Sequence, residues 1–224
     1  MTVVLDKIEA LLYEEFKRVP FHNLFMLNSK TVAPSTLGGT CSDKVLHFKK
    51  VLADKDISTK LQSAFINGID CHRMLSVNIE RNKYFIDVGS GWPSVQLFPA
   101  FEPIEYTVFG MIFKTEITTD NVLIYHKTDK EFNLAVSIPF VQKSKNDIMN
   151  DINNRYSDTS IYPFYKKLRF SKIIDNAFYF IKGDILRVYS QEKITETRLT
   201  KTEIRHLITN VFKFDLGNCS FYFP

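Results

Sequence analysis

The spacing of apolar residues changes near residue 59, and this change is the strongest constraint on the fold. Before it, apolar residues recur every three or four positions, as they do along one face of an amphipathic helix. After it they alternate with other residues, as in strands that bury one face. No part of the chain shows the regular strand–helix–strand alternation of a doubly wound nucleotide-binding fold. Helices, then a sheet, then mixed elements predict an α+β protein.

The first quarter of the chain predicts two helices joined by a loop. Apolar residues recur at helical spacing over 4–19, and Pro20 ends this helix because proline disfavours helical backbone in the residue before it. A second helix is predicted to begin at Cys41 and to close within 54–56. The intervening residues 22–40 contain Gly, Pro, Asn and Ser and are predicted to form a loop.

The rest of the chain predicts antiparallel strands and a C-terminal mixture. A turn at 81–83 separates a strand ending at Ile79 from a strand over Tyr84–Val88, which stops at Gly89-Ser90-Gly91. Further strands are predicted over 104–109, 111–117, 121–126, 132–138, 178–182 and 185–190. Residues 145–156 predict a helix or a connector, and a helix near 201–212 has a capping box of Thr200 and Glu203.

Composition and charge exclude several classes of protein. Hydrophobic residues make up 45% of the 224 residues and aromatic residues 14%, which argues against a disordered chain. The net charge of +4 is too small to indicate nucleic-acid binding. No stretch reaches the ~18 apolar residues of a membrane span, and the N-terminus does not resemble a secretory signal. Three cysteines without regular spacing predict reduced thiols, no metal site and a cytoplasmic protein.

Cys41 is the candidate nucleophile. It follows Gly38-Gly39-Thr40 and opens a predicted helix. A thiol at a helix N-terminus lies at the positive end of the helix dipole, which lowers its pKa and makes thiolate available near neutral pH. The alternative is a small buried residue on the apolar face of that helix.

His72 and Asp87 would complete a triad in which a carboxylate orients a histidine that assists a thiolate nucleophile. They lie on two predicted strands joined by one tight turn, with the parity that puts them on one face. Pairing of Ile79 with Tyr84 would leave them too far apart, whereas pairing of residue 87 with 72 or 74 would bring them into contact. The sequence leaves the register open, and an ordinary strand histidine and a turn-forming aspartate remain alternatives.

Four segments resemble motifs of the arylamine N-acetyltransferase family. RVPFHNL at 18–24 resembles R-[IV]-P-F-E-N-L, and GGTCSD at 38–43 resembles the beginning of G-G-x-C-x-E-x-N-x-x-F. HRMLSV at 72–77 resembles H-R-x-L-x-V, and YFIDVGSG at 84–91 resembles Y-x-V-D-V-G-F-G. Looser matches in the last third extend the resemblance over most of the chain.

The resemblance implies a three-part architecture with a cysteine-protease or transglutaminase-like core. Residues 1–56 would form a helical bundle carrying the nucleophile, 57–144 a β-barrel carrying the histidine and the acid, and 145–224 an α/β lid. It also implies ping-pong transfer of an acetyl group from acetyl-CoA, as co-substrate, to an aromatic amine or hydrazine. Cys41 would be the nucleophile, His72 the acid and base, and Asp87 the orienting carboxylate. Gly89 and Gly91 would line the cleft near the coenzyme.

The chain departs from the family motifs at five positions around the nucleophile. The family's usual residues are replaced by His22, Leu37, Asp43, Val45 and Ser90. Two alternatives therefore stay open. The same triad would serve another acyl transfer, as in amide synthases or transglutaminase-like proteins, or the fold would be an inactive binding module.

Other candidates are assigned structural roles. Cys71 must point away from the face of His72 and is predicted to lie in the core, and Cys219 is predicted to be an apolar filler. Trp92 is predicted either to wall the cleft or to close the core. Lys166, Lys167 and Arg169 are predicted to form a solvated basic face rather than a phosphate site.

Overall fold

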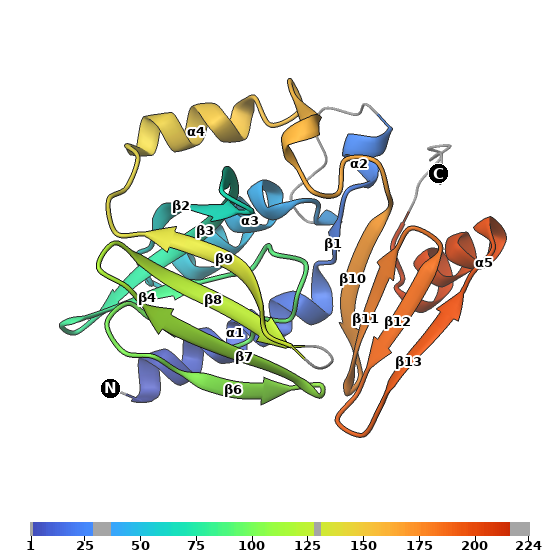
Figure 1. Cartoon of the computed structure of the whole chain (residues 1–224), viewed down its shortest axis with the longest axis horizontal. Coiled ribbons are helices and arrows are strands. Elements are labelled where there is room, and N and C mark those ends of the chain that lie inside the picture. The colour runs from blue at the N-terminus through green and yellow to red at the C-terminus, as the bar shows by residue number, and fades with distance from the viewer. Residues whose placement is uncertain (1, 29–36, 128–130, 216–224) are drawn as a thin grey trace.

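The computed structural model describes residues 2–28, 37–127 and 131–215, which form two antiparallel sheets flanked by helices (Figure 1). The helices are α1 (Thr2–Arg18), α2 (Leu24–Leu27), α3 (Cys41–Ala53), α4 (Lys145–Asn153) and α5 (Lys201–His206), with a 3-10 turn η2 (Thr159–Ile161) and a π-helical turn η3 (Leu207–Val211). None of the described helices is long and apolar enough to cross a membrane.

The first sheet has eight strands in the order β5-β4-β3-β2-β9-β8-β7-β6 and is curled like half a barrel (Figure 1). Its strands are β2 (Lys60–Ile66), β3 (Ile69–Ile79), β4 (Asn82–Ile86), β5 (Phe98–Pro99), β6 (Glu105–Val108), β7 (Met111–Ile117), β8 (Asn121–Lys127) and β9 (Asn133–Pro139). The second sheet has the order β1-β10-β11-β12-β13. Its strands are β1 (Phe21–His22), β10 (Arg169–Ile174), β11 (Ala177–Lys182), β12 (Ile185–Tyr189) and β13 (Ile194–Arg198).

These elements confirm the predicted α+β class, with helices at both ends of the chain and an antiparallel half-barrel between them. The predicted boundaries at 56/57 and 144/145 fall between elements, and the division into three domains stays a prediction. Cys219 lies outside the described residues.

Several local predictions differ from the structure. The predicted loop 22–40 contains β1 and the short helix α2, which is too brief to show helical periodicity. Strand β13 was not predicted because all five of its residues are exposed, so its sequence has no alternation of buried and exposed positions. The predicted helix over 201–212 changes from α to π geometry after His206.

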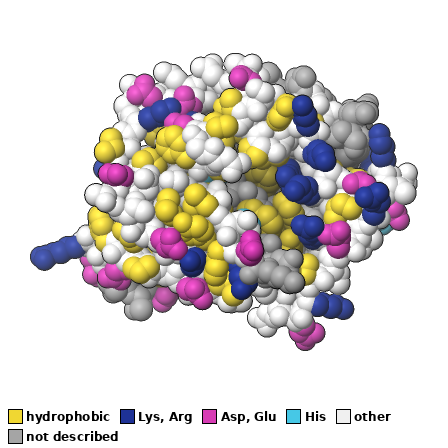
Figure 2. Space-filling view, viewed as in Figure 1, with side chains coloured by type: hydrophobic (Ala, Val, Ile, Leu, Met, Phe, Trp, Pro, Cys, Tyr) yellow, Lys and Arg dark blue, Asp and Glu magenta, His cyan; other side chains and the backbone are white. Residues whose placement is uncertain are grey.

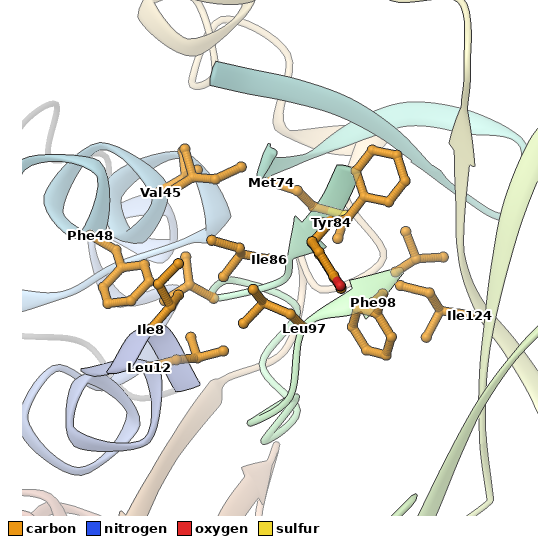
Figure 3. Close-up of a cluster of buried hydrophobic side chains, with 14 of the residues drawn as sticks. Ile8, Leu12, Val45, Phe48, Met74, Tyr84, Ile86, Leu97, Phe98 and Ile124 are labelled. Atoms are coloured by element: carbon orange, nitrogen blue, oxygen red, sulfur yellow. The ribbon is translucent and has the colours of Figure 1, made fainter. Parts of the chain in front are cut away.

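The larger core lies between the N-terminal helices and the half-barrel (Figure 3). Ile8 of α1 and Val45 and Phe48 of α3 are fully buried, and they pack with Met74 of β3 and Ile86 of β4. The apolar spacing in both helices therefore marks the face that meets the sheet. This packing lays α3 along β3, so the first residue of the helix is held over that strand.

A second core lies between the five-stranded sheet, α2 and α5. Leu24 packs there with Phe170 of β10, Ile181 of β11 and Ile204 of α5. The segment that holds β1 and α2 follows α1 directly, so it ties the first core to the second sheet.

Candidate active site

The pairing of β3 with β4 decides where the predicted acid lies. Ile79 pairs with Asn82, and Leu75 with Ile86. One more step along the ladder puts Asp87 opposite Met74, which is one of the two registers expected to bring it to His72. The pairing of Ile79 with Tyr84 is wrong because the hairpin turns at only two residues, where Glu80 adopts a left-handed φ of 56°.

His72 and Asp87 are in direct contact. Nε2 of His72 lies 2.9 Å from Oδ1 of Asp87, and both side chains are almost completely buried. The same Oδ1 accepts hydrogen bonds from the backbone N–H groups of Gly89 at 3.2 Å and Ser90 at 3.0 Å. Burial alone would raise the pKa of Asp87, but the charge of His72 and these hydrogen bonds outweigh burial and lower it. Asp87 is therefore held as a carboxylate.

Cys41 occupies the first position of α3, and a capping box fixes that end of the helix. Thr40 is the N-cap, and its backbone N–H donates to Oδ2 of Asp43 at 2.9 Å. Cys41 is only 2% exposed, and its Sγ lies 3.6 Å from the carbonyl oxygen of Cys71. The nucleophile thus lies on a rigid helix end directly over β3.

Cys41 and His72 shift each other's pKa. Burial would raise the pKa of the Cys41 thiol, but hydrogen bonding to His72, the charge of His72 and the backbone N–H of Arg73 lower it below its usual value. Burial would lower the pKa of His72, but Asp87 and Cys41 raise it. Because Nε2 of His72 is bonded to Asp87, the other ring nitrogen, Nδ1, is the one that can donate to the sulfur of Cys41. The arrangement favours a thiolate–imidazolium pair, which can attack an acyl carbon and move a proton.

Gly89 lies against the nucleophile. A Cβ added there would lie 2.5 Å from the Cα of Cys41, so any larger residue would displace the start of α3. Gly91 has a φ of +83°, and an added Cβ would meet the ring of Phe21 at 3.1 Å. Both glycines therefore allow close approach of the strand-end loop to neighbouring segments. Their contact with a coenzyme stays a prediction.

Two of the departures from the family motifs have partners in the structure. Asp43 uses its second oxygen, Oδ1, to bind Nη2 of Arg155 at 2.7 Å. His22 is fully buried with a pKa lowered by burial to about 4, so its ring is neutral. Its Nε2 donates to the Leu37 carbonyl at 3.0 Å, and its Nδ1 accepts from the backbone N–H of Leu24 at 3.3 Å. Asp43 and His22 therefore both have polar partners within the protein.

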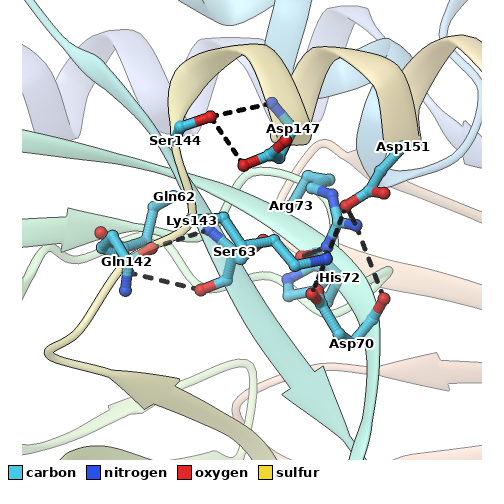
Figure 4. A network of polar contacts seen from close by, with 10 residues as sticks. All are labelled: Gln62, Ser63, Asp70, His72, Arg73, Gln142, Lys143, Ser144, Asp147 and Asp151. Carbon is cyan, nitrogen blue, oxygen red and sulfur yellow. Dashed lines mark hydrogen bonds and ion pairs between the residues drawn. The ribbon is translucent and has the colours of Figure 1, made fainter.

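Arg73 connects the histidine strand to α4 (Figure 4). Its guanidinium binds Asp70 at 2.5 Å and Asp151 of α4 at 2.8 Å, and Lys143 bridges the same two carboxylates at 2.6 and 2.9 Å. Arg73 faces away from His72, and its backbone N–H reaches Cys41. The network holds the backbone that flanks the candidate triad.

A cleft of about 240 Å³ lies where the two sheets meet. Ser90, whose backbone N–H binds Asp87, lines this cleft, whereas Cys41, His72 and Asp87 do not. Its lining includes the aromatic residues Phe21, Trp92 and Phe180 and the basic residues Arg169, Lys182 and Arg187. Figure 2 shows basic side chains gathered over the C-terminal sheet, beside hydrophobic side chains at this junction. The cleft thus combines aromatic walls with a cationic rim.

Trp92 and His126 have roles that the sequence left unresolved. Trp92 both walls the cleft and packs against Phe180, with ring centroids 4.8 Å apart, so both of its predicted roles apply. His126 lies 4.5 Å from the Trp92 ring, and within the described part of the chain its buried Nδ1 has no hydrogen-bond partner. No motif marked His126, because only the curl of the sheet brings β8 to the cleft.

Arg169 lies at the cleft, and Cys71 lies in a buried cluster. Arg169 is partly buried: it lines the cleft, and its pKa is lowered to about 10 by burial and by Arg187. Cys71 is 4% exposed and packs with Met26 and Tyr162, in agreement with the predicted core position. Within the described ranges, no three His, Cys, Asp or Glu side chains gather as a metal site.

Asn23 is a positioning residue whose role the sequence did not reveal. Its Nδ2 donates to the carbonyls of Phe164 at 2.7 Å and Lys167 at 2.8 Å, and its Oδ1 accepts from the backbone N–H of Arg169 at 2.8 Å. These partners lie more than 140 positions away along the chain. Asn23 therefore fixes the segment that forms one wall of the cleft.

Comparison with solved structures shows the same fold. An arylamine N-acetyltransferase from Mycobacterium smegmatis superposes with a TM-score of 0.82 at 17% identity, covering 96% of this chain and 88% of that one. The Mycobacterium marinum enzyme in complex with CoA gives 0.81 at 14% identity, covering 94% and 86%. A Bacillus cereus enzyme described as having a unique Cys-His-Glu catalytic triad gives 0.77 at 19% identity, covering 96% and 93%. No curated protein matches the chain.

The family profile described as N-acetyltransferase matches residues 35–221, which is most of the chain. The fold and this match define an acetyl-transferring enzyme. The protein belongs to the arylamine N-acetyltransferase family, as its motifs predicted.

Proposed function

We propose that this enzyme moves an acetyl group from acetyl-CoA, through a thioester on Cys41, to the nitrogen of an arylamine or hydrazine. The observation that carries the proposal is the buried contact chain from Cys41 through His72 to Asp87. Family membership and the CoA complex of the M. marinum relative support the choice of donor.

The first half-reaction loads the cysteine. The Cys41 thiolate attacks the carbonyl carbon of the acetyl thioester, and the carbon–sulfur bond to CoA breaks as the tetrahedral adduct collapses. His72, held as an imidazolium by Asp87, gives its proton to the departing CoA sulfur. The cysteine is then an acetyl thioester and His72 is neutral.

The second half-reaction transfers the acetyl group from Cys41 to the amine. The amine nitrogen attacks the thioester carbon, and neutral His72 takes a proton from that nitrogen. The Cys41 sulfur leaves as a thiolate, which the new imidazolium stabilises. Asp87 accepts from Nε2 throughout, so Nδ1 keeps facing the reacting atoms.

The cleft suits both substrates. Arg169 and Lys182 are positioned to receive CoA phosphates, because phosphate oxygens bind guanidinium and ammonium groups. Trp92 and Phe180 offer aromatic faces to the pantetheine arm or to an aromatic amine. Gly89 and Gly91 would let either substrate approach the loop that covers Cys41.

Incubation with acetyl-CoA and no acceptor tests the proposal by intact mass. We expect one acetyl group on Cys41, absent in Cys41→Ser and strongly reduced in His72→Ala. An unmodified mass with fast iodoacetamide labelling of Cys41 would exclude acetyl-CoA as donor and favour another acyl transfer. Slow labelling as well would contradict the proposed triad.

A further inference from the structure

We propose that a second basic groove, at the end of α3 remote from Cys41, binds an oligophosphate group. This groove has a volume of about 610 Å³. Lys49 of α3 lines it, eight residues from Cys41, which is roughly 12 Å along a helix. None of its lining residues lines the cleft where the two sheets meet, so the proposal does not rest on acetyl transfer.

The floor of the groove is one face of three adjacent strands. Lys60 of β2 pairs directly with Ser76 of β3, and Asn78 of β3 pairs with Lys83 of β4. Residues that pair in antiparallel strands point to the same face, and Ser76 and Asn78 are two apart on one strand. The four polar side chains therefore form one continuous surface on which two ammonium groups converge.

The sides of the groove come from segments distant in sequence. Lys49 lies near the end of α3, and Thr59 lies in the loop before β2. Gln142 and Lys143 lie between β9 and α4, and Lys145 is the first residue of α4. Figure 4 shows Gln62 of β2 together with Gln142 and Lys143 from the segment before α4. Five lysines thus line a groove to which, among the described residues, no Asp or Glu contributes.

Most of this positive charge is not neutralised by the protein. Lys143 is paired with Asp70 and Asp151, but the other four lysines form no ion pair with any described residue. Lys49 donates to the Thr59 carbonyl at 2.5 Å, which leaves its charge uncompensated. An anion in the groove would supply the missing counter-charge.

Burial and like charges add to this imbalance. The pKa of Lys49 is lowered by burial and by Lys145, and that of Lys83 by burial and by Lys60. The hydroxyl of Thr59 is buried without a hydrogen-bond partner among the described residues, although Thr59 itself lines the groove. A ligand with several acceptor oxygens would satisfy the lysines, which donate but cannot accept.

The lining determines the class of ligand. Leu61 is the single apolar residue among those that line the groove, and no aromatic ring lines it. The groove therefore lacks a surface for stacking a base or holding an acyl chain. Ammonium, hydroxyl and amide groups spread over several strands fit a chain of phosphates better than one compact anion. A nucleoside triphosphate and inorganic polyphosphate share this chemistry.

Calorimetric titration of the full-length enzyme with tripolyphosphate tests the site. We expect binding that weakens about tenfold or more in the Lys60→Gln/Lys83→Gln variant. The matched control is Lys166→Gln/Lys167→Gln, which removes the same charge from a separate groove that these two lysines line together with Arg198. This control variant should bind tripolyphosphate as the wild type does. Thermal melting of both variants checks that they remain folded.

Two further arms complete the test. ATP should bind about as tightly as tripolyphosphate if the phosphates alone are recognised, whereas much tighter ATP binding would indicate a nucleotide site. Saturating desulfo-CoA should not displace tripolyphosphate. Displacement by desulfo-CoA, equal losses in the two variants, or no binding to the wild type would overturn the proposal. Acetylation of Cys41 should be unchanged in Lys60→Gln/Lys83→Gln, so failure of the proposed function would show separately.

Discussion

At Cys41, burial and neighbouring groups act on the thiol pKa in opposite directions. Burial raises it, and His72 with the backbone N–H of Arg73 lowers it by more. Cys71 is also buried, and burial together with the nearby Cys41 raises its pKa to about 11, although a backbone hydrogen bond from Ile66 opposes the shift. The reactivity of each thiol therefore depends on what donates to its sulfur.

The rate of iodoacetamide labelling measures this difference directly. We expect Cys41 to label with a pH midpoint below the ordinary value of about 8.5. In His72→Ala the pH midpoint of Cys41 labelling should rise, because burial raises the pKa of the thiol and His72 no longer lowers it. Cys71 serves as the internal control and should stay unlabelled at neutral pH. A midpoint unchanged by His72→Ala would contradict the pairing of Cys41 with His72.

Asp87 is predicted to act through the orientation and charge of His72. Asp87→Asn should reduce the rate of Cys41 acetylation by about 10³–10⁴-fold, since a neutral amide no longer stabilises the imidazolium. Asp87→Glu keeps the charge and should retain more activity. Stopped-flow or quenched acetylation gives both rates. Equal losses in the two variants would show that packing, rather than the carboxylate charge, is what the position supplies.

At the scale of elements, α3 is held at its N-terminus and along its length. Its N-terminus has the Thr40 capping box and the ion pair of Asp43 with Arg155, which follows α4. Along its length Val45 and Phe48 pack on the sheet. Because Cys41 is the first residue of this helix, contacts of α3 are transmitted to the nucleophile.

Breaking the Asp43–Arg155 pair should therefore affect stability and reactivity together. Both side chains are largely buried, with 8% and 12% of their areas exposed. Arg155→Gln should lower the free energy of unfolding by about 1.5–3 kcal/mol and slow acetylation of Cys41. Lys114→Gln, which breaks an exposed pair with Glu116, should change stability by less than about 1 kcal/mol. Denaturant titration compares the two, and similar small effects would contradict a role for the buried pair.

At the scale of the whole molecule, α1 and α3 meet around a buried lysine. Nζ of Lys44 donates to the Val19 carbonyl at 2.5 Å and lies 3.7 Å from Oε1 of Glu15. Burial lowers the pKa of Lys44 to about 8, although Glu15 opposes the shift. The folded protein therefore binds fewer protons on this group than the unfolded chain between pH 8 and about 10.4.

This difference predicts the pH dependence of folding stability. Where the unfolded state binds more protons, stability rises with pH, so the contribution of Lys44 should increase from pH 8 towards 10. Lys44→Met has no such group and should lose that rise. Urea unfolding at pH 7.5, 8.5 and 9.5 measures the slope for both proteins. A wild-type slope no steeper than that of Lys44→Met would show that the lysine titrates normally.

Several features followed from local sequence alone. Helical spacing over 4–19 and after Cys41, with Gly38 and Gly39 before it, placed the candidate nucleophile at a helix start. Alternation in the central region located most of the strands, and parity put His72 and Asp87 on one face. These features depend on residues within a few positions of each other, so short-range periodicity and chemistry are sufficient to predict them.

Only the tertiary structure decided the rest, because it depends on contacts between distant segments. His72 and Asp87 point to the same face of the sheet whether Ile79 pairs with Asn82 or with Tyr84, so the alternation of residues cannot choose between these registers. The turn and the packing of β4 select the pairing of Ile79 with Asn82, which brings Asp87 to His72. Asn23 bonds partners more than 140 positions away, and His126 reaches the cleft through the curl of the sheet. The second basic groove likewise consists of side chains from separate strands and loops. Its positive charge becomes concentrated only when folding brings these lysines together.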